Sequence, residues 1–287
     1  MKIVLIGSTG QLGQDLMKKF QPNNEVIGLT HQNIEVTDYN SVQTLKDQKP
    51  NIIINTAAFH KTDQCEDEPL KTFAVNAVGP KNVVAISKEI NATNIFISTD
   101  YIFSGSKNKP YTEDDIPDPI NTYGISKLAG ELFTKQQPHH YIFRVASLFG
   151  MAGASGKGGN FVETMITKAK KGQAITVVSD MWMSPTYTKD AAETIKKILE
   201  LQLPFGTYHL TNQGHCTWFQ FAQEIFKLTG LTPKLKRIET SQIHTKAKRP
   251  LFSALQSIRL PKYNLEMRNW KEALYSYLVE KGHMIKT

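Results

Sequence analysis

Cysteine and long apolar runs are scarce in this chain of 287 residues. Its two cysteines, Cys65 and Cys216, are too few for a disulfide framework, and no Cys/His pair has the spacing of zinc ligands. The longest apolar runs, such as Ile52–Ile54, are far shorter than a bilayer span, and no secretory leader follows Met1. We therefore expect a cytoplasmic protein with no membrane segment and no metal ligands, and make no assignment for Mg²⁺.

Charge is moderate, with 21% charged residues and a formal net charge of +8 at pH 7. The densest basic stretch runs from Lys234 to Arg249 and lacks the interleaved aromatic residues of proteins that bind single-stranded nucleic acid. No zinc-finger or basic-zipper pattern accompanies it. We expect a solvated surface without a nucleic-acid partner, on which a few basic side chains are available to a substrate diphosphate.

Strand and helix signals alternate through the first half of the chain. Short β-branched runs predict strands, and apolar residues at helical spacing predict the helices between them. The predicted strands are 2–7, 25–29, 52–54, 95–97 and 141–143, and the predicted helices include 12–20, 38–50, a long one through 73–86, and 123–135. This alternation is typical of a doubly wound α/β fold with a parallel, Rossmann-like sheet. The last of these helices is expected to bury its apolar stripe of Ile125, Leu128, Ala129, Leu132 and Phe133.

The character of the sequence changes after Gly150. Glycines 153, 156, 158 and 159 form a flexible approach to a helix that is expected to begin near Asn160. A strand at 175–178, helices near 191–199 and 219–228, and a terminal helix from Trp270 follow. We predict a dinucleotide-binding domain at 1–150 and a smaller substrate lobe at 151–287, with segments at about 174–200 returning to the first domain.

A glycine-rich turn joins the first predicted strand to the first predicted helix. Gly7, Gly10 and Gly13 are spaced as G-x-x-G-x-x-G, directly after the strand. Glycine permits the tight turn and a close backbone approach to a pyrophosphate, and the amino end of the helix attracts the phosphates. In this context the pattern indicates dinucleotide binding rather than a plain structural turn.

The choice of dinucleotide is set at the end of the second predicted strand. A carboxylate there would receive the ribose hydroxyls of NAD, but the chain reads Leu29-Thr-His-Gln32. The missing acid favours NADP(H) or use of both cofactors. NAD(H) stays open, because Glu35 could reach back to the adenosine.

A tyrosine and a lysine four residues apart give the chemical signal. Tyr123 and Lys127 share one face of the predicted helix, and a nearby ammonium is expected to depress the pKa of the phenol. Such a phenol can exchange a proton with a carbonyl or hydroxyl near neutral pH. Thr99 and Asp100 end the fourth predicted strand, at the edge where ligands bind in open α/β sheets. Thr99 could hydrogen-bond the same substrate oxygen, and Asp100 could equally be a turn cap.

Together these motifs resemble a known family. The glycine turn, Ser98-Thr-Asp-Tyr-Ile-Phe-Ser-Gly105 and Tyr123-x-x-x-Lys127 are similar to the extended short-chain dehydrogenase/reductases, and more narrowly to the dTDP-4-dehydrorhamnose reductase family. The likeness continues through Asn55-Thr-Ala-Ala58, Ser184-Pro-Thr-Tyr187 and Arg249-Pro250, so that it covers nearly the whole chain.

The resemblance implies that hydride passes from NAD(P)H to C4 of a nucleoside-diphosphate 4-keto-6-deoxyhexose, converting dTDP-4-dehydrorhamnose to dTDP-rhamnose. By that resemblance Tyr123 gives the proton, Lys127 lowers the tyrosine pKa and holds the nicotinamide ribose, and Thr99 orients the carbonyl. Substrate contacts would come from Thr99, Asp100 and Arg249. Cofactor contacts would come from Gly7, Gly10, Gln11, Leu12, Gly13, Glu35, Val36, Ala57, Ala58, Phe59, Tyr123 and Lys127.

Two stretches depart from the family pattern. Members usually read R-T-S-W after the fifth strand, where this chain has Arg144-Val-Ala-Ser147, so a tryptophan associated with the sugar pocket is replaced by serine. After the third strand this chain introduces His60 and Lys61. Both changes could alter the preferred sugar or base.

Other functions stay open from the sequence. An epimerase or a 4,6-dehydratase shares the fold, although dehydratases usually carry an Asp-Glu pair where this chain has Asp100-Tyr101. A non-catalytic NADP-binding subunit, resembling the regulatory subunit of methionine adenosyltransferase, would also retain the tyrosine and lysine. The expected partner is a nucleotide-sugar, and a homodimer is left open; Glu272 and Glu280 offer no geometry for a metal bridge.

Overall fold

A six-stranded parallel sheet forms the centre of the computed structural model, which describes residues 1–153 and 159–284. The sheet order is β10-β5-β4-β3-β1-β2, all neighbours being parallel. Its strands are β1 (Lys2–Ile6), β2 (Glu25–Leu29), β3 (Ile52–Asn55), β4 (Thr93–Thr99), β5 (His140–Val145) and β10 (Gly206–His209). The order reverses between β1 and β3, which places a ligand crevice at the carboxyl ends of these strands.

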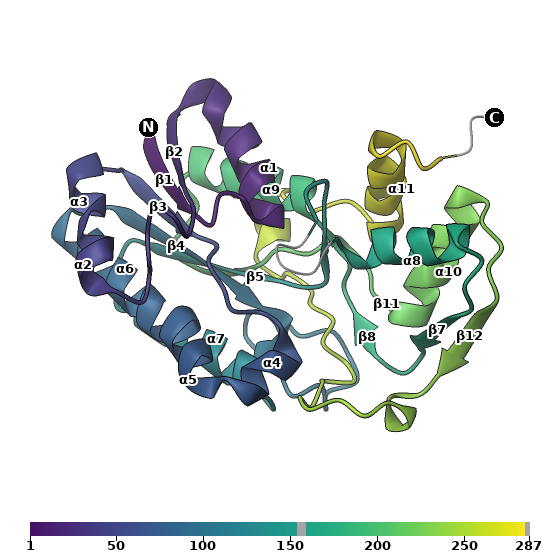
Figure 1. The fold of residues 1–287 in the computed structure, drawn as a ribbon. Coiled ribbons are helices and arrows are strands. Elements are labelled where there is room, and N and C mark those ends of the chain that lie inside the picture. The colour runs from purple at the N-terminus through teal and green to yellow at the C-terminus, as the bar shows by residue number, and fades with distance from the viewer. Residues whose placement is uncertain (154–158, 285–287) are drawn as a thin grey trace.

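Helices cover both faces of this sheet (Figure 1). On one face lie α1 (Gln11–Phe20) and α9 (Thr188–Glu200), whose Leu16 and Ile195 pack on Ile3 and Leu5. The other face carries α2 (Tyr39–Gln43), α3 (Leu45–Gln48), α6 (Gly79–Glu89) and α7 (Thr122–Thr134). The predicted doubly wound, Rossmann-like fold is confirmed.

Two predicted helices are divided. The helix expected at 38–50 is split at Thr44 into α2 and α3. The long helix expected through 73–86 consists of α5 (Pro69–Phe73), a π-helical turn η2 (Ala74–Val78) and α6, after the short α4 (Thr62–Asp67). Pro69 and Pro80 lie in the first turns of α5 and α6, where a missing N–H is tolerated. Short 3₁₀ turns complete this inventory: η1 (Gln21–Asn23), η3 (Asp100–Ile102), η4 (Thr240–Gln242) and η5 (Leu260–Tyr263).

The expectation for the buried face of α7 is wrong. Ile125 and Leu132, in the apolar stripe, are 45% and 57% exposed. The buried face instead consists of small or polar residues, namely Gly124, Ser126, Lys127, Gly130, Glu131 and Thr134. A Cβ on Gly130 would lie 2.4 Å from the carbonyl oxygen of Asn76, so the small residues let α7 approach η2 closely. Backbone approach and polar contacts, not apolar area, decide which face packs.

A smaller lobe is built from the second half of the chain. Its core joins Phe149, Val162, Phe221 and Tyr277. Its strands and helices are β6 (Leu148–Phe149), α8 (Phe161–Lys170), β7 (Ile175–Val178), β8 (Trp182–Met183), β9 (Thr186–Tyr187), β11 (Cys216–Thr217), α10 (Trp218–Thr229), β12 (Leu235–Ile238) and α11 (Trp270–Glu280). The predicted approach to α8 includes Gly156 and Gly158, which lie outside the described residues, and Asn160 caps α8 through the amide of Glu163.

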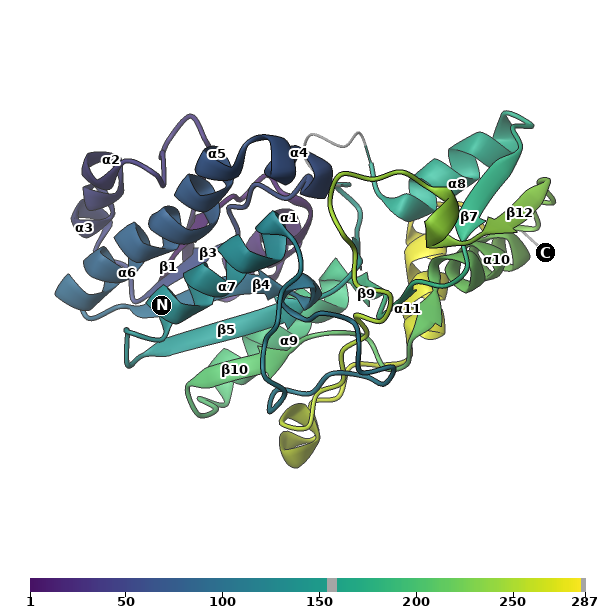
Figure 2. The ribbon, with the colours of Figure 1, turned by 90° about the horizontal axis from the view of Figure 1, so that it is seen from below.

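Later segments return to the large sheet, but over a range different from 174–200. Ile175–Val178 pairs with Leu235–Ile238 in the small lobe, because β12 supplies its hydrogen-bonding edge there. The segments that return are α9, packed on α1, and β10, paired with β5 (Figure 2). The large-sheet unit therefore draws on residues up to His209. Within residues 1–153 and 159–284, no helix has the length and apolar character to cross a membrane.

Candidate active site

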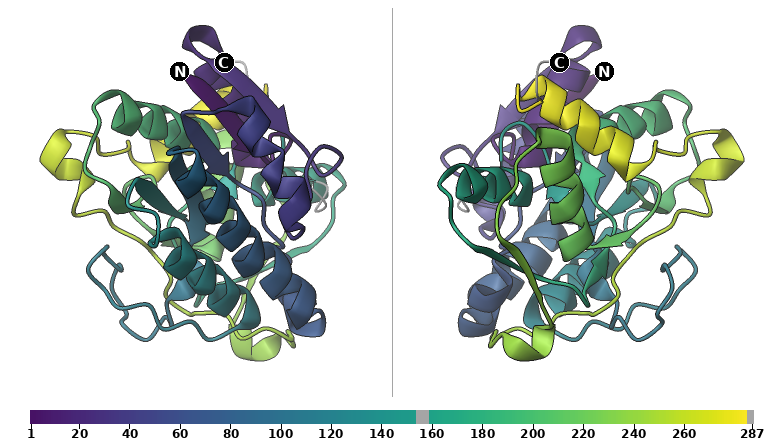
Figure 3. Two further views of the ribbon diagram at one scale, coloured as in Figure 1. Left: turned by 90° about the vertical axis from the view of Figure 1, so that its left-hand side faces the viewer. Right: turned by 90° about the vertical axis from the view of Figure 1, so that its right-hand side faces the viewer.

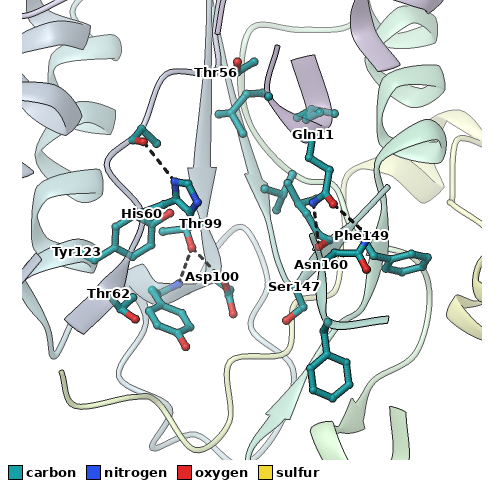
Figure 4. Close-up of a pocket in the computed structure, with 18 of the residues that line it drawn as sticks. Gln11, Thr56, His60, Thr62, Thr99, Asp100, Tyr123, Ser147, Phe149 and Asn160 are labelled. Carbon is teal, nitrogen blue, oxygen red and sulfur yellow. Dashed lines mark hydrogen bonds between the residues drawn. The ribbon is translucent and has the colours of Figure 1, made fainter. Parts of the chain in front are cut away.

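A cavity of about 660 Å³ lies between the carboxyl edge of the large sheet and the small lobe. This volume is within the range of small-molecule sites. In Figure 4, Tyr123, His60, Thr99 and Asp100 lie on one side and Gln11, Phe149 and Asn160 on the other. The cavity is therefore shared by the two parts of the molecule.

The glycine turn forms one end of the cavity. Gly7 has a φ of +82°, and a Cβ there would lie 2.4 Å from the Thr56 hydroxyl. A Cβ on Gly13 would lie 2.2 Å from the carbonyl oxygen of Gly7. Gly10 caps α1 without a side-chain hydrogen bond, and no acidic residue occupies the first turn. The amino end of α1 thus presents backbone N–H groups and its positive dipole end, as an anionic pyrophosphate requires.

A second observation fits a polar ligand at this cavity. Ser98 lines it from β4, and the Ser98 hydroxyl is buried without a hydrogen-bond partner among the described residues. Buried polar atoms are normally satisfied, so a hydroxyl or amide of a bound group suits this position. The residues present therefore fit a dinucleotide.

Tyr123, Thr99 and Asp100 form a connected group at the sheet edge. Thr99 and Tyr123 lie side by side in the cavity, and the Thr99 hydroxyl donates to Asp100 Oδ1 at 3.0 Å. Ser253 Oγ, from the segment before η5, donates to Asp100 Oδ2 at 2.5 Å. Burial raises the pKa of Asp100 to about 6. Asp100 therefore anchors Thr99 and connects the two parts of the chain, and it does so from inside the cavity lining.

Lys127 lines the same cavity from the buried face of α7. Its side chain is buried, its Nζ donates to the Ile97 carbonyl at 2.6 Å, and that nitrogen lies 3.9 Å from the centroid of the Phe96 ring. Burial lowers the pKa of Lys127 to about 7, while the carboxylate of Glu131 acts in the opposite direction.

The expectation that Lys127 lowers the pKa of the Tyr123 phenol is wrong. Burial raises the pKa of Tyr123, the neighbouring Thr99 hydroxyl lowers it, and the charge of Asp100 raises it. Desolvation of the phenolate dominates, and Lys127 does not contribute to the shift. Tyr123 is thus a protonated phenol, which is the form that donates a proton.

The cavity brings together most of the residues singled out from the sequence. Those that line it are Gly7, Gly10, Gln11, Leu12, Gly13, Ala57, Ala58, Thr99, Asp100, Tyr123 and Lys127. Four others lie elsewhere: Glu35 accepts hydrogen bonds from Thr37, Val36 is buried against Gly79, and Phe59 lies beneath the ammonium of Lys71.

The fourth, Arg249, does not line the cavity itself but contacts Thr62, which does. Its guanidinium donates to both carboxylate oxygens of Asp63, at 2.7 and 3.1 Å, and to Thr62 Oγ1 at 3.1 Å. This ion pair holds the pKa of Asp63 below its usual range. Residues 186 positions apart in the chain are involved, so no local signal in the sequence predicts the contact.

Sequence reasoning missed most of the small-lobe wall. Gln11 reaches across to it, donating to the Leu148 carbonyl at 3.0 Å. The wall includes several aromatic residues and two methionines with no motif of their own: Phe149, Phe161, Met181, Trp182, Met183, Trp218 and Phe221. Trp182 lines the cavity while it also stacks on Phe252. Asn160, which caps α8, lines the cavity as well.

Both departures from the family pattern fall on the cavity. His60 and Thr62 line it after β3, and Ser147 lines it after β5 with a φ of +43°. Figure 4 shows the His60 ring beside Tyr123 and Thr99. The sequence changes thus alter the surface next to the proposed proton donor.

Comparisons with known proteins agree with this geometry. A family model described as the RmlD substrate binding domain matches residues 1–282. The Bacillus subtilis spore coat polysaccharide biosynthesis protein SpsK is 38% identical over 98% of each chain. The dTDP-4-dehydrorhamnose reductase of Salmonella typhimurium is 31% identical, again over 98% of each chain.

Solved structures show the same relationship. A dTDP-4-dehydrorhamnose reductase from Clostridium acetobutylicum has a TM-score of 0.93 and 38% identity, covering 98% of this chain and 100% of that chain. The Bacillus anthracis dTDP-4-dehydrorhamnose reductase, solved in complex with NADP, has a TM-score of 0.92 and 35% identity, covering 97% and 99%. The family resemblance is confirmed, and this chain belongs to the dTDP-4-dehydrorhamnose reductase family of NAD(P)-dependent oxidoreductases.

Proposed function

We propose that this chain reduces the C4 keto group of dTDP-4-dehydrorhamnose, giving dTDP-rhamnose, with NADPH as the reductant. One observation carries the proposal. The protonated phenol of Tyr123, beside Thr99, lines the same cavity as the uncapped amino end of α1. A proton donor and a pyrophosphate cradle therefore share one enclosed space, in a chain that belongs to a family of reductases.

Each of the three side chains has a task in this proposal. Tyr123 donates its phenolic proton to the alkoxide that forms at C4, and its raised pKa keeps that proton available at neutral pH. Thr99 positions the carbonyl oxygen next to the phenol. The bound nicotinamide supplies the hydride. Lys127 holds the nicotinamide ribose, and its ammonium favours the negative charge that develops on the substrate oxygen.

We propose NADP(H) as the preferred cofactor, with NAD(H) also accepted. Where β2 ends, the cavity is lined by His31, and Glu35 is engaged with Thr37. No carboxylate among the described lining residues at this end would repel a 2′-phosphate. Titration of NADPH and NADH by intrinsic fluorescence is expected to show tighter binding of NADPH. Exclusive binding of NADH would contradict this.

The division of tasks between the two parts of the chain follows. Residues 1–150 hold the cofactor, and residues 151–287 mainly hold the nucleotide-sugar, whose base suits the aromatic wall of Phe161 and Trp218. Arg249 binds the diphosphate in place of Asp63. Its guanidinium lies beside Tyr101, which lines the cavity.

We also propose that the chain forms a homodimer through the α7 face, defined here as Leu70, Phe73, Val78, Ile125 and Leu132. These exposed side chains lie on α5, η2 and α7, which pack together on the outside of the molecule (Figure 3). A two-fold axis brings identical patches together, so an uncharged apolar patch is complementary to itself. Light scattering should show a dimer that Leu132→Glu converts to monomer, while Leu201→Glu, also exposed, leaves it intact. A monomeric wild-type protein would contradict this.

A cytoplasmic location is part of the same proposal. The side chains of Cys65 and Cys216 are both buried, and their thiol form is the one that a reducing compartment preserves. Burial also raises the pKa of the Cys216 thiol, which protects it from oxidation. Fractionation of the native cells, with a periplasmic or surface marker as control, should place the protein with cytoplasmic markers.

The central test is NADPH oxidation, followed at 340 nm with dTDP-4-keto-6-deoxyhexose as substrate. Tyr123→Phe is expected to lower kcat by about 100-fold or more, because it removes the general acid. Tyr208→Phe is the matched control, since this buried phenol donates to the Pro204 carbonyl, outside the cavity. Normal turnover by Tyr123→Phe, or no turnover by the wild type, would refute the assignment.

A further inference from the structure

A buried ion pair lies behind the catalytic group. Arg144 on β5 donates to both carboxylate oxygens of Glu131 on α7, at 2.9 and 2.8 Å. The two side chains are 3% and 0% exposed. Because both ions lose their water, such a pair contributes little net stability compared with apolar residues of the same shape. The location of the ion pair therefore says more about its role than its contribution to stability does.

That position relates it to Lys127. Glu131 lies one helical turn after Lys127, on the same buried face of α7. Arg144 pairs in register with Ser98, the residue before Thr99. Lys127 lines the cavity, whereas Glu131 and Arg144 are absent from its described lining. The sequence of charges from the cavity inward is thus ammonium, carboxylate, guanidinium.

The charged groups around Lys127 come from several elements. Glu131 on α7 is the charged group that acts on Lys127. Tyr123 on α7 and Asp100 on η3 line the same cavity as Lys127, while Arg144 on β5 contacts Glu131 and His209 on β10 contacts Arg144. Burial next to Arg144 lowers the pKa of His209 to about 3, so that this imidazole is neutral. Its Nε2 lies 3.4 Å from Arg144 Nη1, and its Nδ1 lies 3.1 Å from the Tyr111 carbonyl.

Glu131 opposes the effect of burial on Lys127. Burial alone favours the neutral amine, and the carboxylate of Glu131 favours the ammonium. The Arg144 guanidinium donates one hydrogen bond to each oxygen of that carboxylate and so fixes its orientation. The neutral His209 adds no further positive charge beside the guanidinium.

We propose that Glu131 is a positioning residue for the reductase reaction, whose buried carboxylate, one helical turn from Lys127, keeps that lysine charged, and that Arg144 acts through Glu131 by fixing its carboxylate. This inference rests on the proposed function of Lys127. A merely structural pair would join α7 to β5 without changing the titration of the lysine.

The test is the titration of Lys127 in the full-length protein. Lysine labelled at Cε is followed by NMR from pH 5.5 to 9.5, with Lys127→Arg used to assign the signal. In Glu131→Gln, which retains the shape and one acceptor, the Lys127 midpoint is expected to fall by about one pH unit. The high-pH limb of kcat for NADPH oxidation should shift by the same amount.

A matched control comes from a similar pair far from the cavity. Arg268 donates to both carboxylate oxygens of Asp190, each at 2.8 Å. Asp190→Asn removes that carboxylate and is expected to leave the Lys127 midpoint unchanged. If Glu131→Gln fails to fold, the double variant Glu131→Leu/Arg144→Met removes both buried charges. The Lys127 midpoint should still fall, but by less, because the loss of the Arg144 charge partly offsets the loss of the Glu131 carboxylate.

The outcomes are separable. A Lys127 midpoint that moves in the Glu131 variants and stays in Asp190→Asn supports the inference, whether or not the sugar is reduced. A folded Glu131 variant with the wild-type midpoint overturns it. An inactive wild-type enzyme would refute the proposed function alone, because the NMR titration needs no substrate.

Discussion

The buried carboxyl of Asp100 should make the wild-type protein less stable at neutral pH than an Asp100→Asn variant. Burial raises the pKa of this group from 3.8 to about 6, in spite of the hydrogen bonds from Thr99 and Ser253. The folded state therefore binds the proton more tightly than the unfolded state. The free energy of unfolding must then fall as the pH rises through the interval between these two values. A difference of about two units corresponds to about 3 kcal/mol.

Urea unfolding at fixed pH values from 4.5 to 8.5 measures this effect. The advantage of Asp100→Asn should be small at pH 4.5, grow with pH, and reach a plateau of about 3 kcal/mol above pH 7. Asp63→Asn is the opposite control: Arg249 lowers the pKa of Asp63 below 3.8, so this variant should be less stable than the wild type by an amount that stays nearly constant from pH 4.5 to 8.5. An Asp100→Asn variant that is less stable at pH 8, or a difference independent of pH, would refute the reasoning.

Three further predictions concern the turn, the core and a helix cap. Gly13→Ala should abolish the thermal shift caused by NADPH, since its Cβ would lie 2.2 Å from a backbone oxygen; a wild-type shift would contradict the tight turn. Leu16→Ala, fully buried, should lower the free energy of unfolding by about 2–5 kcal/mol, and Ile116→Ala, 87% exposed, by less than about 0.5 kcal/mol. Thr217→Ala, which removes the capping box of α10, should lower the melting temperature through a loss of about 1 kcal/mol; an unchanged Tm would show that the cap is redundant.

The parallel sheet and the glycine turn were predictable because their signals are local. A β-branched run followed by Gly7 fixes a strand and its turn within a few residues, and β1 begins and ends within one residue of the prediction. Tyr123 and Lys127 were predictable for the same reason, since helical spacing alone places them on one face.

The buried face of α7 was not predictable from periodicity. An apolar stripe shows that a helix is amphipathic, but Gly124 and Gly130 decide which side packs, because each lets a neighbouring backbone approach where a Cβ would collide. The contacts of Asp100 with Ser253 and of Arg249 with Asp63 join distant segments, and only the folded chain brings them together. The small-lobe wall escaped prediction because aromatic residues that pack and aromatic residues that line a cavity look alike in a sequence.

Strand β10 has a consequence for how the chain can be dissected. His209 pairs with Arg144 at the rim of the large sheet, and α9 covers the apolar side of α1. A polypeptide that stops at residue 150 would leave β5 as an open edge and α1 without its cover. Unpaired edges are templates for aggregation. During synthesis the nucleotide-binding half must wait until the chain up to residue 209 has emerged, so an expression fragment of that half should extend beyond residue 209.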